Sequence, residues 1–228
     1  MHLDDLEAII KGATWIIPLL FSIIPHEIAH GYAAYLLGDS TAKDAGRLSI
    51  NPIKHIDLYG TILIPLFLMI SNFGFVFGYA KPVPVDFKRI LNIKKGLVIV
   101  AVAGPLINFI LAFIFMFLIY VTKNFMDKEA FLTMFLQMSF VNAVLLNLVL
   151  CFFNLIPIPP LDGGKIMMGI LPHNLAVKYS RLDGRLGFLL VILLMILPNV
   201  FGEKYDVIGY VLGYFVKLIL SLPFISNI

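Results

Sequence analysis

The chain has 228 residues, of which 60% are hydrophobic and only 14% are charged, and its mean hydropathy is +0.96. A soluble domain carries about 25% charged residues, so this composition predicts an integral membrane protein that lies in a lipid bilayer. The formal net charge of +3 is too small to indicate binding to nucleic acid, and we expect no such partner. The single cysteine, Cys151, excludes an internal disulfide framework.

Apolar runs of roughly membrane-spanning length follow one another along the whole chain, and short polar connections separate them. They cover residues 12–37, 58–77, 96–121, 131–156, 186–201 and 207–222. No basic segment precedes the first run and no small-residue cleavage site follows it, so we expect no removable signal peptide. The predicted fold class is an all-α membrane bundle that forms a single domain over residues 1–228.

The first apolar run contains the sequence His-Glu-Ile-Ala-His at positions 26–30. On a helix, His26 and His30 lie one turn apart on the same face, so both imidazoles could bind one metal ion. Glu27 lies beside them and could accept a proton from a water molecule at the metal. Because ionisable groups in an apolar helix cost free energy, their presence predicts a functional site.

A catalytic zinc ion usually takes three protein ligands and keeps a fourth position open, so a third ligand must come from elsewhere in the chain. Asp162 is the best candidate. Three prolines before it end the fourth apolar run, and Gly163 and Gly164 after it allow a tight backbone bend. These residue types together predict hydrolysis of an amide by metal-activated water.

The positions of these ligands also constrain the topology. The two histidines lie near the end of the first run and Asp162 lies near the end of the fourth, so both ends must face the same side of the membrane. Six simple crossings would place them on opposite sides. We therefore predict about five transmembrane helices, with residues 58–86 entering the membrane and returning as a re-entrant helix and β-hairpin.

The positive-inside rule supports this arrangement, because it gathers more of the lysines and arginines on one side, which we predict to be cytoplasmic. The N-terminus would then lie outside the cell. His30 precedes Gly38 by eight residues, so the metal should lie about 12 Å deep at a rise of ~1.5 Å per residue.

Residues 73–86 could form the β-like hairpin. Pro82 and Pro84 would lie on one edge, where they cannot donate hydrogen bonds. The opposite edge could then pair with an extended substrate segment. The alternative is a structural loop that only fills the bundle.

Together, these stretches resemble the site-2 protease family of intramembrane zinc metalloproteases over about residues 20–175. The resemblance is carried by residues 26–30, by Ala103-Gly104-Pro105 followed by Asn108, and by Asn-Leu-Ile-Pro-Ile-Pro-Pro-Leu-Asp-Gly-Gly at 154–164. Residues 46–57 and 78–85 are similar to a compact bacterial branch, and this chain shows no PDZ or CBS domain.

The resemblance implies one zinc ion (Zn2+) per chain on His26, His30 and Asp162, with Glu27 as the general base. It implies a multi-pass protein of the cell membrane whose active site faces the cytoplasm. The implied partners are transmembrane-protein substrates such as regulatory precursors, anti-sigma factors or signal-peptide remnants.

Three further side chains are candidates for supporting roles. The resemblance suggests that Asn154 holds an unwound substrate backbone near the metal. Asn108 could do the same, although either amide could instead pack between helices. His55, in the first polar loop, could tune the site or could simply be a polar group near the lipid headgroups.

Two other classes of function could use some of these residues. A non-catalytic metal-binding protein or a divalent-cation transporter could use the same ligands, but it has no need of a base such as Glu27. Paired halves with matching broken helices, typical of many transporters, are not seen in the sequence. An intramembrane aspartyl protease is disfavoured because its candidate residues, Asp39 and Asp206, lie in polar loops and in reversed order.

Overall fold

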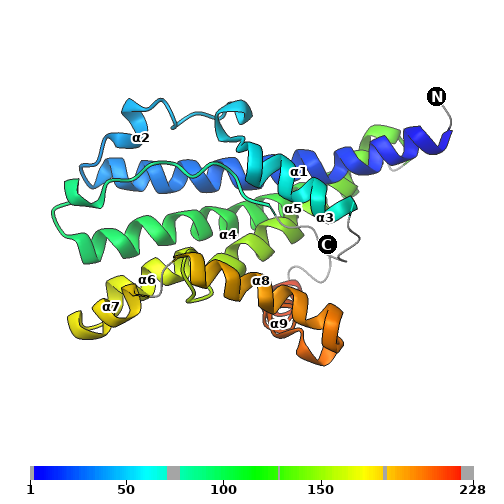
Figure 1. Cartoon of the computed structure of the whole chain (residues 1–228). Helices are drawn as coiled ribbons and strands as arrows, with labels where there is room; N and C mark the ends of the chain where they lie inside the picture. Colours follow the sequence, from blue (N-terminus) through cyan, green and yellow to red (C-terminus); the bar gives the residue numbers. More distant parts are fainter. Residues whose placement is uncertain (1–2, 71–77, 128, 182–183, 222–228) are drawn as a thin grey trace.

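The computed structural model describes residues 3–70, 78–127, 129–181 and 184–221 (Figure 1). Within these ranges the secondary structure is helical, and no strand is present. The α-helices are α1 (Leu3–Leu36), α2 (Thr41–Asp44), α3 (Ile64–Ile70), α4 (Ile93–Phe125), α5 (Phe131–Asn154), α6 (Asp162–Ile170), α7 (His173–Ser180), α8 (Gly184–Phe201) and α9 (Val207–Leu220). Shorter helical turns are η1 (Pro52–His55), η2 (Leu58–Leu63), η3 (Phe87–Arg89) and η4 (Glu203–Tyr205).

Four helices in the described ranges are long and apolar enough to cross a membrane, namely Ile9–Leu36 of α1 together with α4, α5 and α8. This result confirms the prediction of an all-α membrane fold. The fifth predicted span corresponds to α9, which has 14 residues. At ~1.5 Å per residue α9 extends about 21 Å, which is shorter than the ~30 Å hydrocarbon core of a bilayer.

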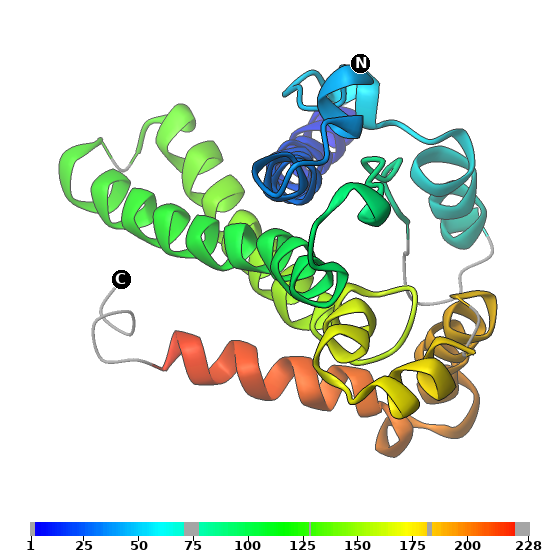
Figure 2. The ribbon, with the colours of Figure 1, turned by 90° about the vertical axis from the view of Figure 1, so that its left-hand side faces the viewer.

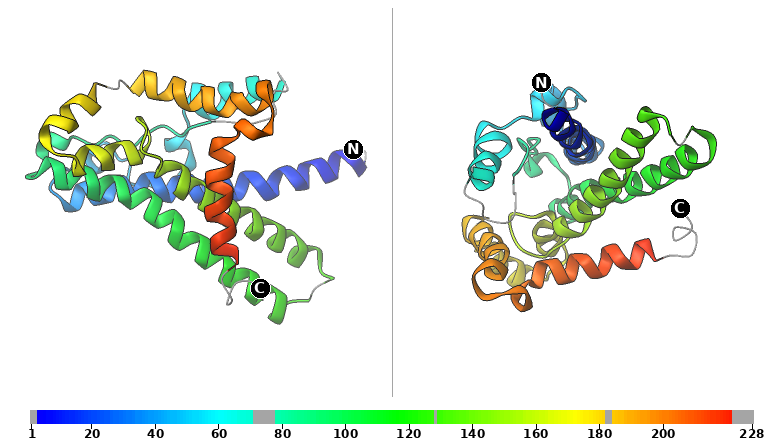
Figure 3. Two further views of the ribbon diagram at one scale, coloured as in Figure 1. Left: turned by 90° about the horizontal axis from the view of Figure 1, so that it is seen from below. Right: turned by 90° about the vertical axis from the view of Figure 1, so that its right-hand side faces the viewer.

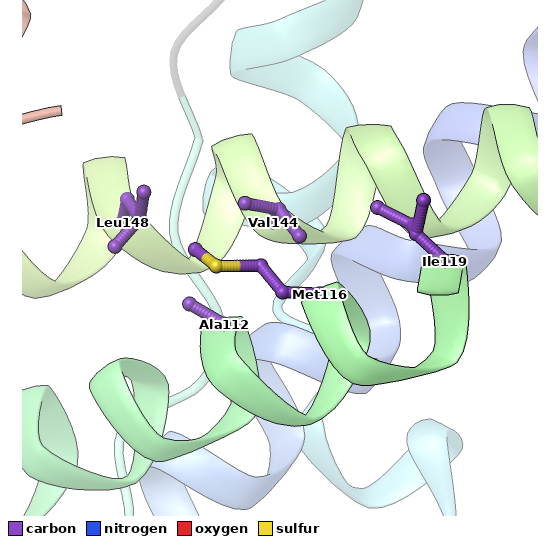
Figure 4. Packing of buried hydrophobic residues seen from close by; sticks show 5 residues of the cluster. All are labelled: Ala112, Met116, Ile119, Val144 and Leu148. Carbon is purple, nitrogen blue, oxygen red and sulfur yellow. The ribbon is translucent and has the colours of Figure 1, made fainter. Parts of the chain in front are cut away.

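Helices α1, α4 and α5 pack side by side and form the centre of the molecule (Figure 1). Ala112, Met116 and Ile119 of α4 are buried against Val144 and Leu148 of α5 (Figure 4). Between helices in lipid, such contacts stabilise through close van der Waals packing rather than through release of water. Helix α9 packs on α5 and runs across the bundle (Figure 3).

The chain between α1 and α4 leaves and returns at the same end of the bundle. The N–H of Asp86, just before α4, donates to Asp39 Oδ2, just after α1, over 2.7 Å. Helices α1 and α5 consequently run in the same direction, and α6 and α7 lie at the end where α1 stops (Figure 1). The two parts of the predicted metal site are therefore brought to one end of the molecule.

The predicted β-hairpin falls partly on residues 73–77, which lie outside the described residues. Residues 78–86 are described and have no regular secondary structure. This segment passes between α1 and α3 (Figure 2), and we refer to it below as the inner segment. Its contacts with α1 bring it to the catalytic candidates.

Candidate metal site

His26, His30 and Asp162 come together as one buried group. Asp162 Oδ2 lies 3.3 Å from His26 Nε2 and 3.0 Å from His30 Nε2, and the two Nε2 atoms are 3.0 Å apart. Two ligand atoms of a tetrahedral zinc ion, each bound at ~2.1 Å, lie about 3.4 Å apart. The three donor atoms are therefore almost at the mutual spacing that one zinc ion requires.

The second ring nitrogen of each histidine meets an oxygen atom from α4. His30 Nδ1 donates to the carbonyl oxygen of Val100 over 2.7 Å, and His26 Nδ1 lies 2.5 Å from Asn108 Oδ1. Since a carbonyl oxygen can only accept, the proton of neutral His30 is on Nδ1 and Nε2 keeps a lone pair for a metal.

Gly104 provides the space that the imidazoles occupy. A Cβ atom at this position would lie 2.4 Å from His30 Nε2 and 2.6 Å from His26 Cε1. Real Cβ atoms do not approach other atoms this closely, so the backbone of α4 forms one wall of the metal site and excludes any larger residue. Donor spacing, ring hydrogen bonds and this wall together fit a bound metal ion.

Asp162 is the first residue of α6, and the two glycines after it are helical. The sequence predicts that Gly163 and Gly164 allow a tight bend, and the structure places both in the first turn of α6. Neither has a positive φ. Instead, a Cβ atom on Gly163 would lie 2.3 Å from the carbonyl oxygen of Leu155, and one on Gly164 would lie 2.8 Å from the nitrogen of Pro159. Glycine is needed here because α6 folds closely against the chain that precedes it.

Lys165 is a further residue of the site that was not predicted from the sequence. Its Nζ atom lies 2.9 Å from Asp162 Oδ1, whereas Oδ2 faces the imidazoles. One carboxylate oxygen of Asp162 thus binds Lys165, and the other faces the metal position. The spacing of three residues on a helix was the signal that could have revealed it.

Glu27 is half-buried and is held by the inner segment. The N–H of Val83 donates to Glu27 Oε2 over 2.8 Å. One turn along α1, a Cβ atom on Gly31 would lie 2.7 Å from Val83 Cγ1, which shows how closely the segment lies against the helix. The carboxylate is thus oriented by a backbone group from a distant part of the chain.

The inner segment uses the edge that the sequence analysis assigned to a substrate. Tyr79 N–H donates to Gly60 O over 3.0 Å, Lys81 N–H donates to His55 O over 2.8 Å, and Val83 N–H donates to Glu27. These three donors alternate along one edge and all have partners within the chain. The prediction that this edge receives a substrate strand is therefore wrong for the described residues.

The remaining candidates lie outside the metal group. His55 is buried, its Nε2 donates to Ser49 O over 2.7 Å, and its Nδ1 has no partner among the described residues. Asn154 ends α5, and its amide nitrogen donates to Leu150 O of the same helix over 3.0 Å. The geometry brings neither residue to the metal ligands, and their supporting roles stay predictions.

Behind the site lie two residues that the sequence analysis did not select, Asn147 and Ser22. Both are fully buried and connect to Asn108. An asparagine in the middle of an apolar run was the available signal, because such an amide needs a hydrogen-bonding partner inside the bundle.

A buried group of two histidines and one aspartate, set among apolar helices with a glutamate next to the first histidine, defines a metal-dependent membrane hydrolase. The family model of Peptidase family M50 matches residues 14–134 and 122–196. The chain therefore belongs to this family, whose members are of the site-2 protease type.

Curated relatives agree with this assignment. The chain is 40% identical over 184 residues to "Putative zinc metalloprotease YwhC" of Bacillus subtilis, covering 80% of each chain. It is 29% identical to "Putative zinc metalloprotease Rip2" of Mycolicibacterium smegmatis over 78% of this chain and 65% of the relative. It is 31% identical to "Zinc metalloprotease MJ0392" of Methanocaldococcus jannaschii over 45% of this chain and 28% of the relative. No solved structure matches.

The family and the printed names establish the coarse identity of the chain. It is a site-2 protease-like zinc metalloprotease and a multi-pass membrane protein, and its cofactor is zinc.

Proposed function

We propose that this protein is an intramembrane endopeptidase that hydrolyses peptide bonds within or near transmembrane segments of its substrates. The observation that carries the proposal is the burial of the metal group: His26 and His30 are each 7% exposed and Asp162 is 4% exposed, and both histidines lie on a candidate membrane-spanning helix. A site in this position favours a substrate that arrives through the bilayer.

His26 and His30 would hold the zinc ion through Nε2, and Asp162 would hold it through Oδ2. When bound, zinc supplies Lewis-acid chemistry that lowers the pKa of water to about 7. Glu27 is one residue from His26 and would accept the proton of the attacking water and pass it to the leaving amine. Because Val83 N–H donates to Oε2, we assign the proton to Oε1.

We further propose that the site faces the cytoplasmic side of the cell membrane. Several lysines and arginines lie near the end of the bundle where α1 stops and support this orientation: Lys43, Arg47, Lys88, Arg89 and Lys178. The proposed substrates are regulatory membrane-protein precursors, anti-sigma factors or signal-peptide remnants. Asn154, eight residues before Asp162, would help to hold their unwound backbone.

The test compares the native chain with Glu27→Gln in detergent, using a single-span membrane protein as substrate. Glutamine preserves the shape of the side chain but cannot act as a base, so zinc content should stay at one per chain while cleavage falls by about 10²-fold or more. Glu203→Gln, an exposed glutamate in η4, is the matched control and should cleave normally.

Continued substrate cleavage by Glu27→Gln would show that Glu27 is not the general base. Zinc uptake into proteoliposomes, together with no cleavage by the native chain, would instead favour the transporter.

A further inference from the structure

Behind His26, three fully buried side chains from three helices form a continuous hydrogen-bonded chain. They are Ser22 on α1, Asn108 on α4 and Asn147 on α5, and each is 0% exposed. Asn108 Oδ1 faces His26 Nδ1, and Asn108 Nδ2 donates to the backbone oxygen of Ser22 over 2.9 Å and to Asn147 Oδ1 over 2.8 Å. Neither Asn147 nor Ser22 is a candidate metal ligand.

Every bond in this chain has a fixed direction. Asn147 Nδ2 donates to the carbonyl oxygen of Ala143 over 2.8 Å, and a carbonyl can only accept, so the amide oxygen of Asn147 must face Asn108. The Ser22 hydroxyl donates to Pro18 O over 2.8 Å and accepts from Asn147 Nδ2 over 2.8 Å. All the donors therefore point away from the metal site.

These fixed directions determine which ring nitrogen of His26 carries the proton. Two acceptors surround Asn108 Nδ2, so its oxygen must face the imidazole, and His26 Nδ1 must donate to it. That arrangement leaves Nε2 unprotonated and aimed at Asp162. If the Asn108 amide turned round, its N–H would face Nδ1, the ring proton would move to Nε2, and that proton would block metal binding.

We infer that Asn147 is a positioning residue for the zinc site: it acts through Asn108 to hold His26 in the orientation and proton arrangement that bind the metal. This inference rests on the zinc site used in the proposed function. Loss of a partner that orients a ligating histidine typically weakens metal binding by about 10- to 100-fold.

A neighbouring asparagine separates this role from ordinary helix packing. Asn142 also lies on α5, and its Nδ2 also donates to α1, over 2.8 Å to Thr14 O. It thus joins the same two helices with the same kind of bond but has no connection to a metal ligand. A substitution at Asn142 should disturb the α1–α5 contact without changing zinc affinity.

The experiment measures the zinc dissociation constant of the purified full chain by competition with a chelator, and the absorption spectrum of the Co²⁺-substituted protein. Asn147→Leu should bind zinc about 10- to 100-fold more weakly and should alter the Co²⁺ spectrum. Asn147→Asp retains an oxygen that accepts from Asn108, and its second oxygen, kept protonated by burial, replaces Nδ2 as the donor to the carbonyl oxygen of Ala143, so zinc affinity should stay within a few-fold of native. Asn142→Leu should bind like the native chain.

The inference is overturned if Asn147→Leu binds zinc as tightly as the native chain, if Asn142→Leu is weakened equally, or if Asn147→Asp is as weak as Asn147→Leu. Should Asn147→Leu not fold, Asn108→Leu tests the next member of the chain and must show at least the same loss. Zinc affinity is read without any substrate, so the expected pattern in a chain that cleaves nothing would support the positioning role and reject the protease.

Discussion

Position 104 shows how a single residue can be essential to a metal site without binding the metal. The α4 backbone lies directly against both imidazoles because Gly104 has no side chain. Asp162, the third proposed ligand, has its second oxygen held by Lys165. The imidazoles and the carboxylate are thus each positioned by a residue that does not bind the metal, and small changes at Gly104 or Lys165 should change the metal affinity.

Gly104→Ala should displace both imidazoles, because the added Cβ would lie 2.4 Å from His30 Nε2. We expect zinc affinity to fall by at least about 10-fold, as for other losses of ligand orientation, measured by chelator competition. The control is Gly12→Ala on α1, where the new Cβ would meet nothing within 4 Å. Native zinc affinity in Gly104→Ala would show that the wall is more yielding than its geometry indicates.

Asp162→Ala removes the proposed third ligand, so the purified chain should contain well under one zinc per molecule after desalting, as measured by elemental analysis. Asp127→Ala, an exposed aspartate after α4, should retain its metal. A full complement of zinc in the Asp162 variant would assign the third ligand to another residue.

The spacing of His26, Glu27 and His30 could be read from the sequence because one helical turn fixes their relation. Asp162 could be predicted from the prolines before it and the demand for a third ligand. Lys165 and Asn147 carry weaker signals, a spacing of three residues from Asp162 and an amide within an apolar run, and Gly104 stands out only as part of the family resemblance. Their roles depend on which atoms of distant elements lie beside them, and local periodicity does not encode these contacts.

Among the elements, the chain between α1 and α4, which we call the excursion, has its two ends joined by the buried carboxylate of Asp39. Asp39 accepts hydrogen bonds from the N–H and hydroxyl of Thr41 and from the N–H of Asp86. Burial alone would raise the pKa of Asp39. The hydrogen bonds from Thr41 and Asp86, together with the charge of Arg89, outweigh it and hold that pKa below its ordinary value.

This shift predicts a pH dependence of stability. Because the folded pKa of Asp39 is lowered, its contribution is complete above its unfolded pKa of about 3.9 and is lost as the pH falls through the folded value. Asp39→Asn should therefore lower the free energy of unfolding at pH 7, and its difference from the native chain should shrink below about pH 4. Denaturation in mixed detergents at several pH values measures the loss of stability at pH 7 and its decrease at lower pH.

The control is Asp44→Asn, an exposed aspartate nearby on α2 that accepts from Ser40. It should change stability little at any pH. A constant stability difference for Asp39→Asn between pH 7 and pH 3 would contradict the assigned role of its charge.

The long apolar helices could be predicted from the sequence, because a bilayer requires continuous apolar runs of known length. The contacts of the inner segment could not be predicted from the sequence. Alternating prolines indicated an edge without hydrogen-bond donors, but the sequence does not show that the N–H groups of the other edge are already paired with Gly60, His55 and Glu27. Those partners lie up to 56 residues away, and only the folded chain brings them together.

At the scale of the whole molecule, the bond between Asp39 and Asp86 joins the end of α1 to the chain just before α4. Helices α1 and α5 therefore stop at the same end of the bundle (Figure 1), which allows the ligands to meet. A topology with an additional crossing would separate Asp162 from the histidines by the thickness of the bilayer.

Single cysteines at Lys54 and Lys88, placed in a Cys151→Ser background, test this topology in intact cells. Both lysines are exposed and lie on the excursion. A membrane-impermeant thiol reagent should therefore label both variants equally and from one side only. Asn124→Cys, at the far end of α4, should react from the opposite side. Labelling of Lys54→Cys and Lys88→Cys from opposite sides would reject the arrangement.

A hydrogen bond from residue 83 orients Glu27. A main-chain amide provides it, so nineteen of the twenty amino acids at position 83 retain the donor, and only proline deletes it. The hydrogen bond to the carboxylate thus depends on the path of the backbone, whereas the buried side chain of Val83 sets how closely that backbone lies against α1.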